Sequence, residues 1–440
     1  MRGVRMLRPL SIRDFRLLWT GMTVSLLGDG VFYVALAWQV YQLRNAPTAL
    51  GVVGVAISVP NVLFLLLGGV VSDRVERRVV MIAADLVRGA ALLAMGWLAV
   101  AGALRLWEVL LLAVPYGAGT AFFGPAFDAI VPDLVPPGLL AEANSLDQFV
   151  RPAALRLAGP ALGGVLISAW SAGGALVVDG ASFFVSVAML LLMRARPSPA
   201  AGAAGPVSAW TEVREGFGFV RRHVWLWGTF LAATVAYLLF MGPTEVLLPF
   251  VVKNVMRGSG GDLGLVFAAG GLGAILAAIV VGQRGMPRRH VTAMYVSWAI
   301  ATFSVAGYGL ARLPWQAMAA CFAFNAFEAA GTVWWATTKH RLVPARLLGR
   351  VSSFDWFISI GLLPVSFALT GPIAHAIGVR ATLVWAGVLG GAVTLAALFL
   401  PGMRTIERDG SMSGAPVLLA SSEAEVGLEV TPAAIGPDAA

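Results

Sequence analysis

The sequence predicts an all-α integral membrane protein with twelve transmembrane helices in two six-helix bundles. Apolar residues make up 58% of its 440 residues and charged residues only 12%, about half the charged share of a soluble domain. The stretch Val135–Phe149 also returns 208 residues later as Val343–Phe357, with Val, Pro, Leu, Leu, Ser, Asp and Phe in register. A Gly-Pro pair follows each copy, at Gly159-Pro160 and Gly371-Pro372. The chain is therefore two copies of one unit.

The individual helices follow from runs of apolar residues. Each crossing needs about 20 mostly apolar residues in one helix, because lipid offers no partner for free backbone groups. The first run follows five arginines but is too long for a signal peptide and lacks a cleavage site, so we expect a retained helix. Helices are expected near 17–43, 49–71, 79–102, 106–130, 144–170, 174–194, 223–252, 261–283, 290–311, 315–338, 351–377 and 380–401.

Composition along the chain divides it into four parts. Residues 1–194 form an N-terminal six-helix bundle and residues 223–402 a C-terminal one. Between them, 195–222 is rich in Pro, Ala and Gly and then polar, which is typical of a linker. Residues 403–440 hold few aromatic residues and many of Ser, Gly, Pro and Glu, so we expect a disordered tail.

The net charge of +8 is explained by membrane topology rather than by nucleic acid. Basic residues are held on the cytoplasmic side during insertion. With the N-terminus inside, three basic residues lie within spans and 22 of the 31 lie in cytoplasmic segments; the six in external loops are Arg44, Arg105, Lys253, Arg257, Arg312 and Arg380. Both termini are therefore expected in the cytoplasm. Only two of the 31 are lysines, which indicates a GC-rich bacterial genome and hence a bacterial cytoplasmic membrane.

The turn between the second and third helices carries a charged motif. It reads Gly69-Val70-Val71-Ser72-Asp73-Arg74-Val75-Glu76-Arg77-Arg78. Asp73 can accept hydrogen bonds from amides at a neighbouring helix N-terminus, and the arginines can bridge to acidic groups or lipid phosphate. Such a cluster can lock one of two conformations. Topology alone would explain the arginines but not Asp73 or the glycine.

These residues resemble the major facilitator superfamily, whose corresponding loop has the pattern G-x-x-x-D-R-x-G-R-[RK]. Gly69, Asp73, Arg74, Arg77 and Arg78 match, while Glu76 replaces the second glycine. That departure is similar to the D-R-x-x-R-R variant of the macrolide-efflux and enterobactin-exporter branch of drug:proton antiporters. With the duplicated halves, the resemblance covers residues 10–401. It implies the major facilitator fold and a role for Asp73 in gating the cytoplasmic side.

A second motif lies in the fifth helix. Gly159-Pro160-Ala161-Leu162-Gly163-Gly164 resembles the antiporter signature G-P-x-x-G-G, which the superfamily associates with export. Proline bends a helix, and glycines at this spacing allow close approach of another helix. The alternative is an ordinary packing face of small residues.

In the fourth helix, Ala113 and Tyr116 stand where many antiporters carry an arginine and a glutamine. The proton-coupling motif of those antiporters is therefore absent from this sequence.

Charges within the spans are the remaining candidates, because each costs several kcal/mol unless it is paired or faces water. Asp29, Glu245 and Glu328 lie in helices that line the central cavity of the superfamily. Each is a candidate for proton exchange or substrate binding, or a structural carboxylate bonded to a neighbouring helix. Arg156 has no partner three or four residues away, so it needs a carboxylate on another helix or an anionic substrate.

Two further acid–base spacings favour structural ion pairs. Asp147 precedes Arg151 by four residues, and Asp355 is its counterpart in the second repeat. Asp85 precedes Arg88 by three. Both spacings place the partners on one face of a helix.

The sequence favours a secondary exporter of amphipathic molecules such as drugs, macrolides or siderophores, working by proton antiport and alternating access. A lipid-like substrate or uptake remains an alternative, as does a transport-dead sensor. An intramembrane enzyme is less favoured, because the four histidines and single cysteine, Cys321, form no nucleophile–base or metal-ligand cluster in the sequence. We expect no cofactor and no metal, a small organic substrate and protons as partners, no nucleic acid, and a monomer in the bilayer.

Overall fold

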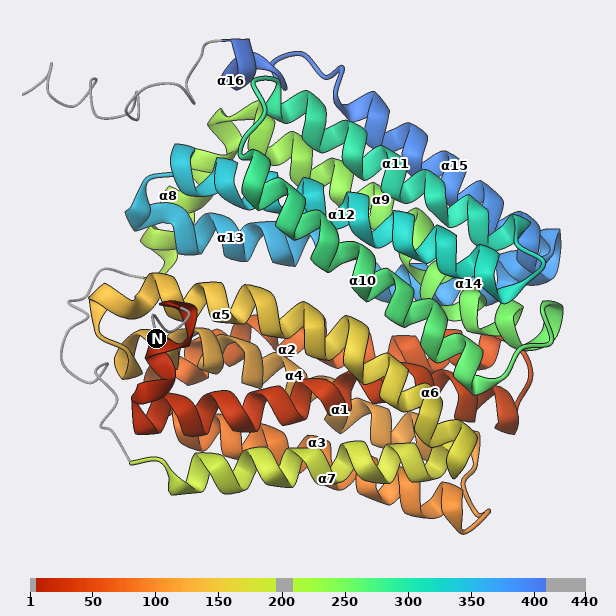
Figure 1. Ribbon diagram of the computed structural model, residues 1–440. Coiled ribbons are helices and arrows are strands. Elements are labelled where there is room, and N and C mark those ends of the chain that lie inside the picture. Colours follow the sequence, from red (N-terminus) through yellow and green to blue (C-terminus); the bar gives the residue numbers. More distant parts are fainter. Residues whose placement is uncertain (1–4, 195–208, 409–440) are drawn as a thin grey trace, which may run out of the picture.

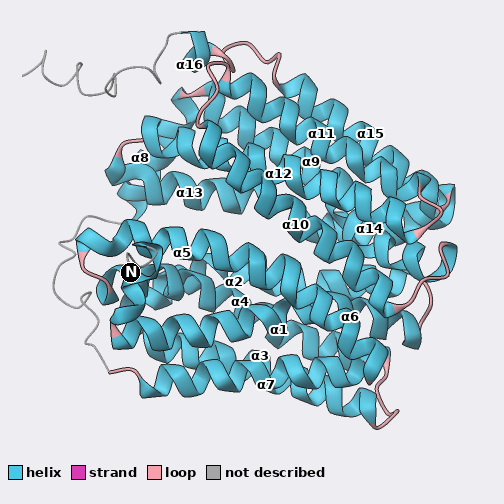
Figure 2. Cartoon of the chain, viewed as in Figure 1, coloured by secondary structure: helices cyan, strands magenta, loops and turns pink. Residues whose placement is uncertain are grey.

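The computed structural model describes residues 5–194 and 209–408 (Figure 1). Helices joined by short loops make up this part of the chain (Figure 2). Within it, eleven segments are long and apolar enough to cross a membrane. The tenth expected crossing, α12 (Pro314–Leu342), is as long but less apolar, because it carries Gln316, Asn325 and Glu328 along its length. The predicted all-α membrane fold is confirmed.

The N-terminal half is a bundle in which each long helix packs against its neighbours. Helix α7 lies against α1 and α3, and α4 lies against α2 and α3. The bounds are α1 (Arg13–Leu43), α2 (Pro47–Arg74), α3 (Arg77–Val100), α4 (Leu106–Leu134), α5 (Leu140–Pro152), α6 (Gly159–Ala169) and α7 (Ala172–Leu192). The fifth expected helix is thus divided into α5 and α6, joined by the π-helical segment Ala153–Ala158.

Pro160 accounts for that wider turn. Proline has no N–H, so it leaves the carbonyl of Arg156 without its helical donor. The N–H of Gly159 bonds instead to the carbonyl of Ala154, five residues earlier. Such π-helical turns inside α-helices are frequent at functional sites, and this one carries Arg156.

The C-terminal half repeats the arrangement. Helix α12 packs against α10 and α11, and α9 packs against α14 and α15. The bounds are α9 (Val224–Phe250), α10 (Gly260–Arg284), α11 (His290–Leu310), α12, α13 (Ala345–Ile360), α14 (Leu363–Ile377) and α15 (Val379–Ala397). The eleventh expected helix breaks between α13 and α14, where Pro364 removes a backbone donor.

Parts of the expected linker and tail are helical. Helix α8 (Ala209–Arg222) occupies the second part of the linker and packs against α13 and α9. Helix α16 (Thr405–Arg408) begins the tail, and Glu407 accepts hydrogen bonds from the N–H and hydroxyl of Thr292 at 3.1 and 2.8 Å. The rest of the predicted linker, 195–208, and of the predicted disordered tail, 409–440, lies outside the described residues.

The two halves meet chiefly through α2 against α14 and α6 against α10. These contacts lie toward the end of the molecule opposite the N-terminus, where α6, α10 and α14 converge in Figure 1. There the Tyr41 hydroxyl donates to the carbonyl of Val246 at 2.6 Å, and the amides of Asn45 and Asn254 bond to each other at 2.6 and 3.0 Å. We call this the closed end and the one carrying the N-terminus the N-terminal end.

Candidate functional site

An ion pair joins the two halves midway along their helices. Arg156 Nη1 lies 3.4 Å from Glu328 Oε2 on α12 and 3.3 Å from Asn325 Oδ1. The other Glu328 oxygen accepts from the Thr332 hydroxyl at 3.0 Å. The Arg156 side chain is 47% exposed and that of Glu328 25%, so water reaches this pair. The structure thus supplies the carboxylate that Arg156 lacked within its own helix.

Two further groups surround this ion pair. Glu245 on α9 is half-buried and lies within electrostatic range of Arg156. Tyr33 on α1 lies within electrostatic range of both Arg156 and Glu245, and it is 50% exposed. The structure therefore brings together three of the four predicted intramembrane candidates, Arg156, Glu245 and Glu328, in the region between the halves.

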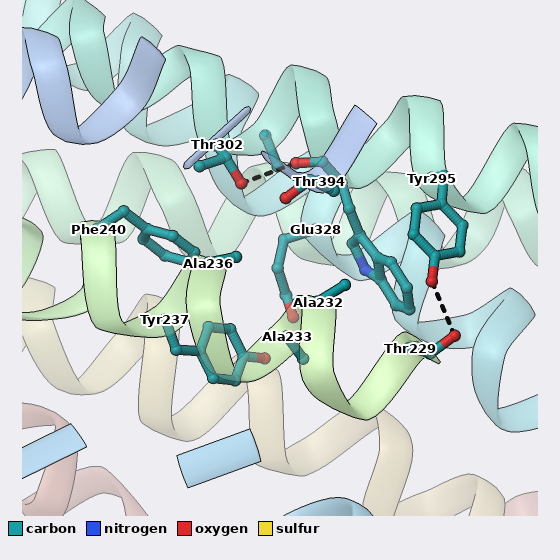
Figure 3. A pocket seen from close by; sticks show the side chains of 12 residues that line it. Thr229, Ala232, Ala233, Ala236, Tyr237, Phe240, Tyr295, Thr302, Glu328 and Thr394 are labelled. Atoms are coloured by element: carbon teal, nitrogen blue, oxygen red, sulfur yellow. Dashed lines mark hydrogen bonds between the residues drawn. The ribbon is translucent and has the colours of Figure 1, made fainter. Parts of the chain in front are cut away.

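A pocket opens beside Glu328 within the C-terminal half (Figure 3). Glu328 is the only carboxylate among its lining residues, and aromatic rings from two helices form much of the wall. The Tyr295 hydroxyl is bonded to Thr229 Oγ1 at 2.8 Å, so that polar atom is already satisfied. The lining residues used below are Tyr237 and Phe240 from α9, Tyr295 and Trp298 from α11, and Glu328.

The fourth candidate, Asp29, lies in a separate cluster inside the N-terminal half. It accepts a hydrogen bond from the Tyr116 hydroxyl of α4 at 3.0 Å. Arg88 of α3 forms a buried salt bridge with Asp85, as its spacing predicted. Asp179 of α7 is fully buried and interacts electrostatically with Asp29 and Arg88. The sequence analysis missed Asp179, although a lone carboxylate in an apolar run was the signal that singled out Asp29.

The two halves use corresponding places differently. In the N-terminal half, the charged side chains of Asp29, Asp85, Arg88 and Asp179 lie between α1, α3, α4 and α7. In the C-terminal half, the pocket lies between the corresponding helices, α9, α11, α12 and α15. The two halves share a fold, but corresponding places hold charged side chains in one half and a mostly apolar pocket in the other.

The charged turn between α2 and α3 lies at the N-terminal end. The packing of Gly69 and of the Asp73 side chain lies outside what the structure describes, and Arg74 is exposed. Arg77 forms a salt bridge with Asp133 and donates to the carbonyl of Ala129 at 2.9 Å, both on α4. Arg78 donates at 2.5 Å to the carbonyl of Met193, after α7. These two arginines therefore tie α3 to its neighbours in the same half.

The glycine-proline motif packs α6 between the two halves. A Cβ placed on Gly30 of α1 would lie 2.7 Å from the Cα of Gly159 and 2.9 Å from Pro160 Cδ. Gly163 faces Val31, also on α1. On the other side, a Cβ on Gly164 would lie 3.2 Å from the Cα of Gly261 on α10. Small residues let α6 approach both helices closely.

The two repeat-loop aspartates form ion pairs at the N-terminal end. Asp147 on α5 pairs with Arg151 at 3.0 Å, as predicted from their spacing. Asp355 on α13 pairs with Lys339 of α12 at 2.5 Å and accepts from Trp335 Nε1 at 2.8 Å. An aromatic ring lies beside each cation, Phe127 beside Arg151 and Trp335 beside Lys339. Both repeats therefore carry an aspartate paired with a cation. In the first repeat the cation, Arg151, lies on the same helix as the aspartate, whereas in the second the cation, Lys339, comes from the preceding helix.

Comparisons with known proteins agree with this architecture. Macrolide efflux protein A of Streptococcus pyogenes is 22% identical over 379 residues, covering 85% of this chain and 93% of that protein. Multidrug efflux pump Tap of Mycolicibacterium fortuitum is 26% identical over 396 residues, covering 86% and 94%.

Solved structures share the fold. A bacterial homologue of the lysosomal transporter Spinster, in an inward-facing and unoccupied conformation, superimposes with a TM-score of 0.65 at 18% identity, covering 91% of this chain and 98% of that one. The nucleoside transporter NupG gives 0.68 at 10% identity, covering 88% and 98%. The profile of the family described as transmembrane secretion effector matches residues 4–427. The chain belongs to this family of major facilitator superfamily transporters.

Proposed function

We propose that this protein exports amphipathic organic molecules, of the drug, macrolide or siderophore kind, from a bacterial cytoplasm in exchange for protons. The observation that carries the proposal is the Arg156–Glu328 contact between the halves, with an aromatic pocket beside it. A transporter of this architecture binds its substrate between its halves and exposes it alternately to either side. The efflux activity named for the two relatives supports this direction of transport.

The bias of basic residues supports a cytoplasmic N-terminal end and therefore an external closed end. The contacts at Tyr41, Asn45 and α10 then seal the external side. Exposure of Tyr33 and Arg156 in the middle of the molecule supports access from the cytoplasm. This conformation is the one that takes up a substrate for export.

The substrate site combines apolar surface with one anion. The rings of Tyr237, Phe240 and Trp298 would cover the apolar body of a substrate, and Glu328 would hold a basic nitrogen. A cation at Glu328 competes with Arg156, so binding weakens the ionic contact between the halves. Substrate entry thereby favours their separation at the external side.

Transport in proteoliposomes tests the proposal. Purified protein is reconstituted and screened with a macrolide, a cationic dye and a catecholate siderophore, with and without an imposed pH gradient. We expect uphill movement of at least one substrate when the gradient is present. If every transported substrate moves at a rate indifferent to the gradient, proton antiport is rejected.

A further inference from the structure

The N-terminal half buries more negative than positive charge. Asp85 and Asp179 are both 0% exposed, and Asp29 is half-buried beside them. Within the described part of this half, Arg88 is the only buried cation, and its salt bridge goes to Asp85. Asp29 and Asp179 lie within electrostatic range of each other and of Arg88, so three carboxyl groups share one cation whose salt bridge goes to Asp85. Two ionised carboxylates in such a place repel each other.

Other charged and titratable groups near this pair do not remove the imbalance. Arg151 of α5 attracts Asp29, but it is paired with Asp147 at 3.0 Å and also attracts Asp128. Tyr33 and Tyr116 contribute hydroxyls and no positive charge.

Packing also fixes the arginine of this cluster in place. The Arg88 guanidinium carbon lies 4.5 Å from each of the Phe123 and Phe183 ring centroids. The two rings and the salt bridge to Asp85 together hold this cation, so its one positive charge serves all three carboxyl groups.

Asp179 has an oxygen without a partner. Its Oδ1 accepts a long hydrogen bond of 3.4 Å from the Ser182 hydroxyl, whereas Oδ2 is buried and has no hydrogen-bonding partner among the described residues. A buried carboxylate oxygen in this state is costly when ionised, but as a carboxylic acid it carries the proton itself.

We propose that Asp29 and Asp179 share one exchangeable proton and form the proton-binding site of this transporter. Asp29 is the entry group, because it is half-buried and neighbours the exposed Tyr33. A proton from water protonates Asp29 and passes to Asp179, and it leaves by the same path in reverse. This proposal rests on the proposed proton antiport and assigns its site.

The Asp29–Asp179 pair also lies close to the contact between the two halves. Gly28 and Gly30 flank Asp29: Gly28 packs directly against Asp179 and Ser182, and Gly30 against Gly159. A change of charge between α1 and α7 therefore acts on the same turn of α1 that contacts α6, and α6 contacts α10. Protonation of the Asp29–Asp179 pair can therefore change the packing of α1 against α6 and, through α6, the contact between the two halves.

The test separates proton coupling from transport itself. Asp179→Asn and Asp29→Asn are compared with wild type and with Glu108→Gln, a control at the closed end that keeps an oxygen to accept from the Arg105 N–H. Three quantities are measured for each protein. They are substrate counterflow at equal pH, uphill transport in a pH gradient, and proton release when substrate is added. We expect both cluster variants to keep counterflow and to lose gradient-driven transport and proton release. Testing two variants guards against misfolding of either.

The outcomes are distinguishable. If Asp179→Asn and Asp29→Asn retain wild-type gradient dependence and proton release, the assignment of the site is overturned. Wild-type counterflow without any response to the gradient would instead reject the proposed antiport. Loss of gradient dependence in Glu108→Gln to the same extent would also overturn the assignment, because the effect would not be specific to the cluster.

Discussion

Arg156 on one half and Glu328 on the other lie 3.4 Å apart midway along the helices, at the edge of the aromatic pocket. Both side chains are partly exposed to water, so their attraction contributes below about 1 kcal/mol to folding. The pair is therefore better suited to a contact that breaks and reforms than to holding the fold together.

Replacing Glu328 by Gln is expected to weaken binding of a cationic dye about tenfold, the effect of losing about 1.4 kcal/mol. The amide keeps the shape of the side chain but removes the charge that a basic nitrogen needs. Glu328→Asp keeps the charge and is the matched control. The Michaelis constant for dye efflux is the measurement, with the unfolding temperature unchanged in both variants. Equal Michaelis constants for Glu328→Gln and wild type would contradict the role of Glu328 in binding a basic nitrogen.

Joining Asn45 to Asn254 is expected to stop transport reversibly. The two amides bond across the halves at the closed end, and alternating access requires them to part. The experiment places cysteines at both positions in a Cys321→Ser background and adds a short, reducible thiol cross-linker. Each single-cysteine variant, treated alike, is the control. Full activity of the cross-linked protein would show that this end does not open.

Gly264→Val is expected to reduce transport strongly, whereas Gly282→Val on the same helix leaves it nearly intact. A Cβ on Gly264 would lie 2.6 Å from the carbonyl oxygen of Pro160, but one on Gly282 meets no atom within 4 Å. The added side chain pushes α10 from α6 and weakens the closed end. Efflux and thiol labelling of a cysteine at position 45 report the effect. Unchanged labelling and efflux in Gly264→Val would contradict tight packing between α6 and α10.

Arg88→Met is expected to lower the free energy of unfolding by about 3–5 kcal/mol, because it leaves Asp85 as an unpaired buried charge. Arg44→Met, at an exposed position of the same half, is the control. Denaturant titration of the detergent-solubilised protein measures both. A loss for Arg88→Met no larger than the control's would mean that Asp85 is neutral in the folded protein.

Much of the fold follows from local properties of the sequence. The length and apolarity of the spans determine that the chain crosses a membrane, since each helix must satisfy its own backbone in lipid. The repeat at Asp147 and Asp355 indicated two related halves. Local spacing also predicted the Asp147–Arg151 and Asp85–Arg88 pairs, because positions three or four apart share one helix face.

Other features required the tertiary structure. The partner of Arg156 lies 172 residues away on α12. Asp29 accepts a hydrogen bond from Tyr116 on α4 and lies within electrostatic range of Asp179 on α7. The apolar pocket beside Glu328 gave no sequence signal, since its aromatic residues resemble those that face lipid. The sequence by itself determined which residues are too polar for the bilayer. Only the packing of distant helices decided which of them meet, because that depends on helix rotation and contact rather than on position along the chain.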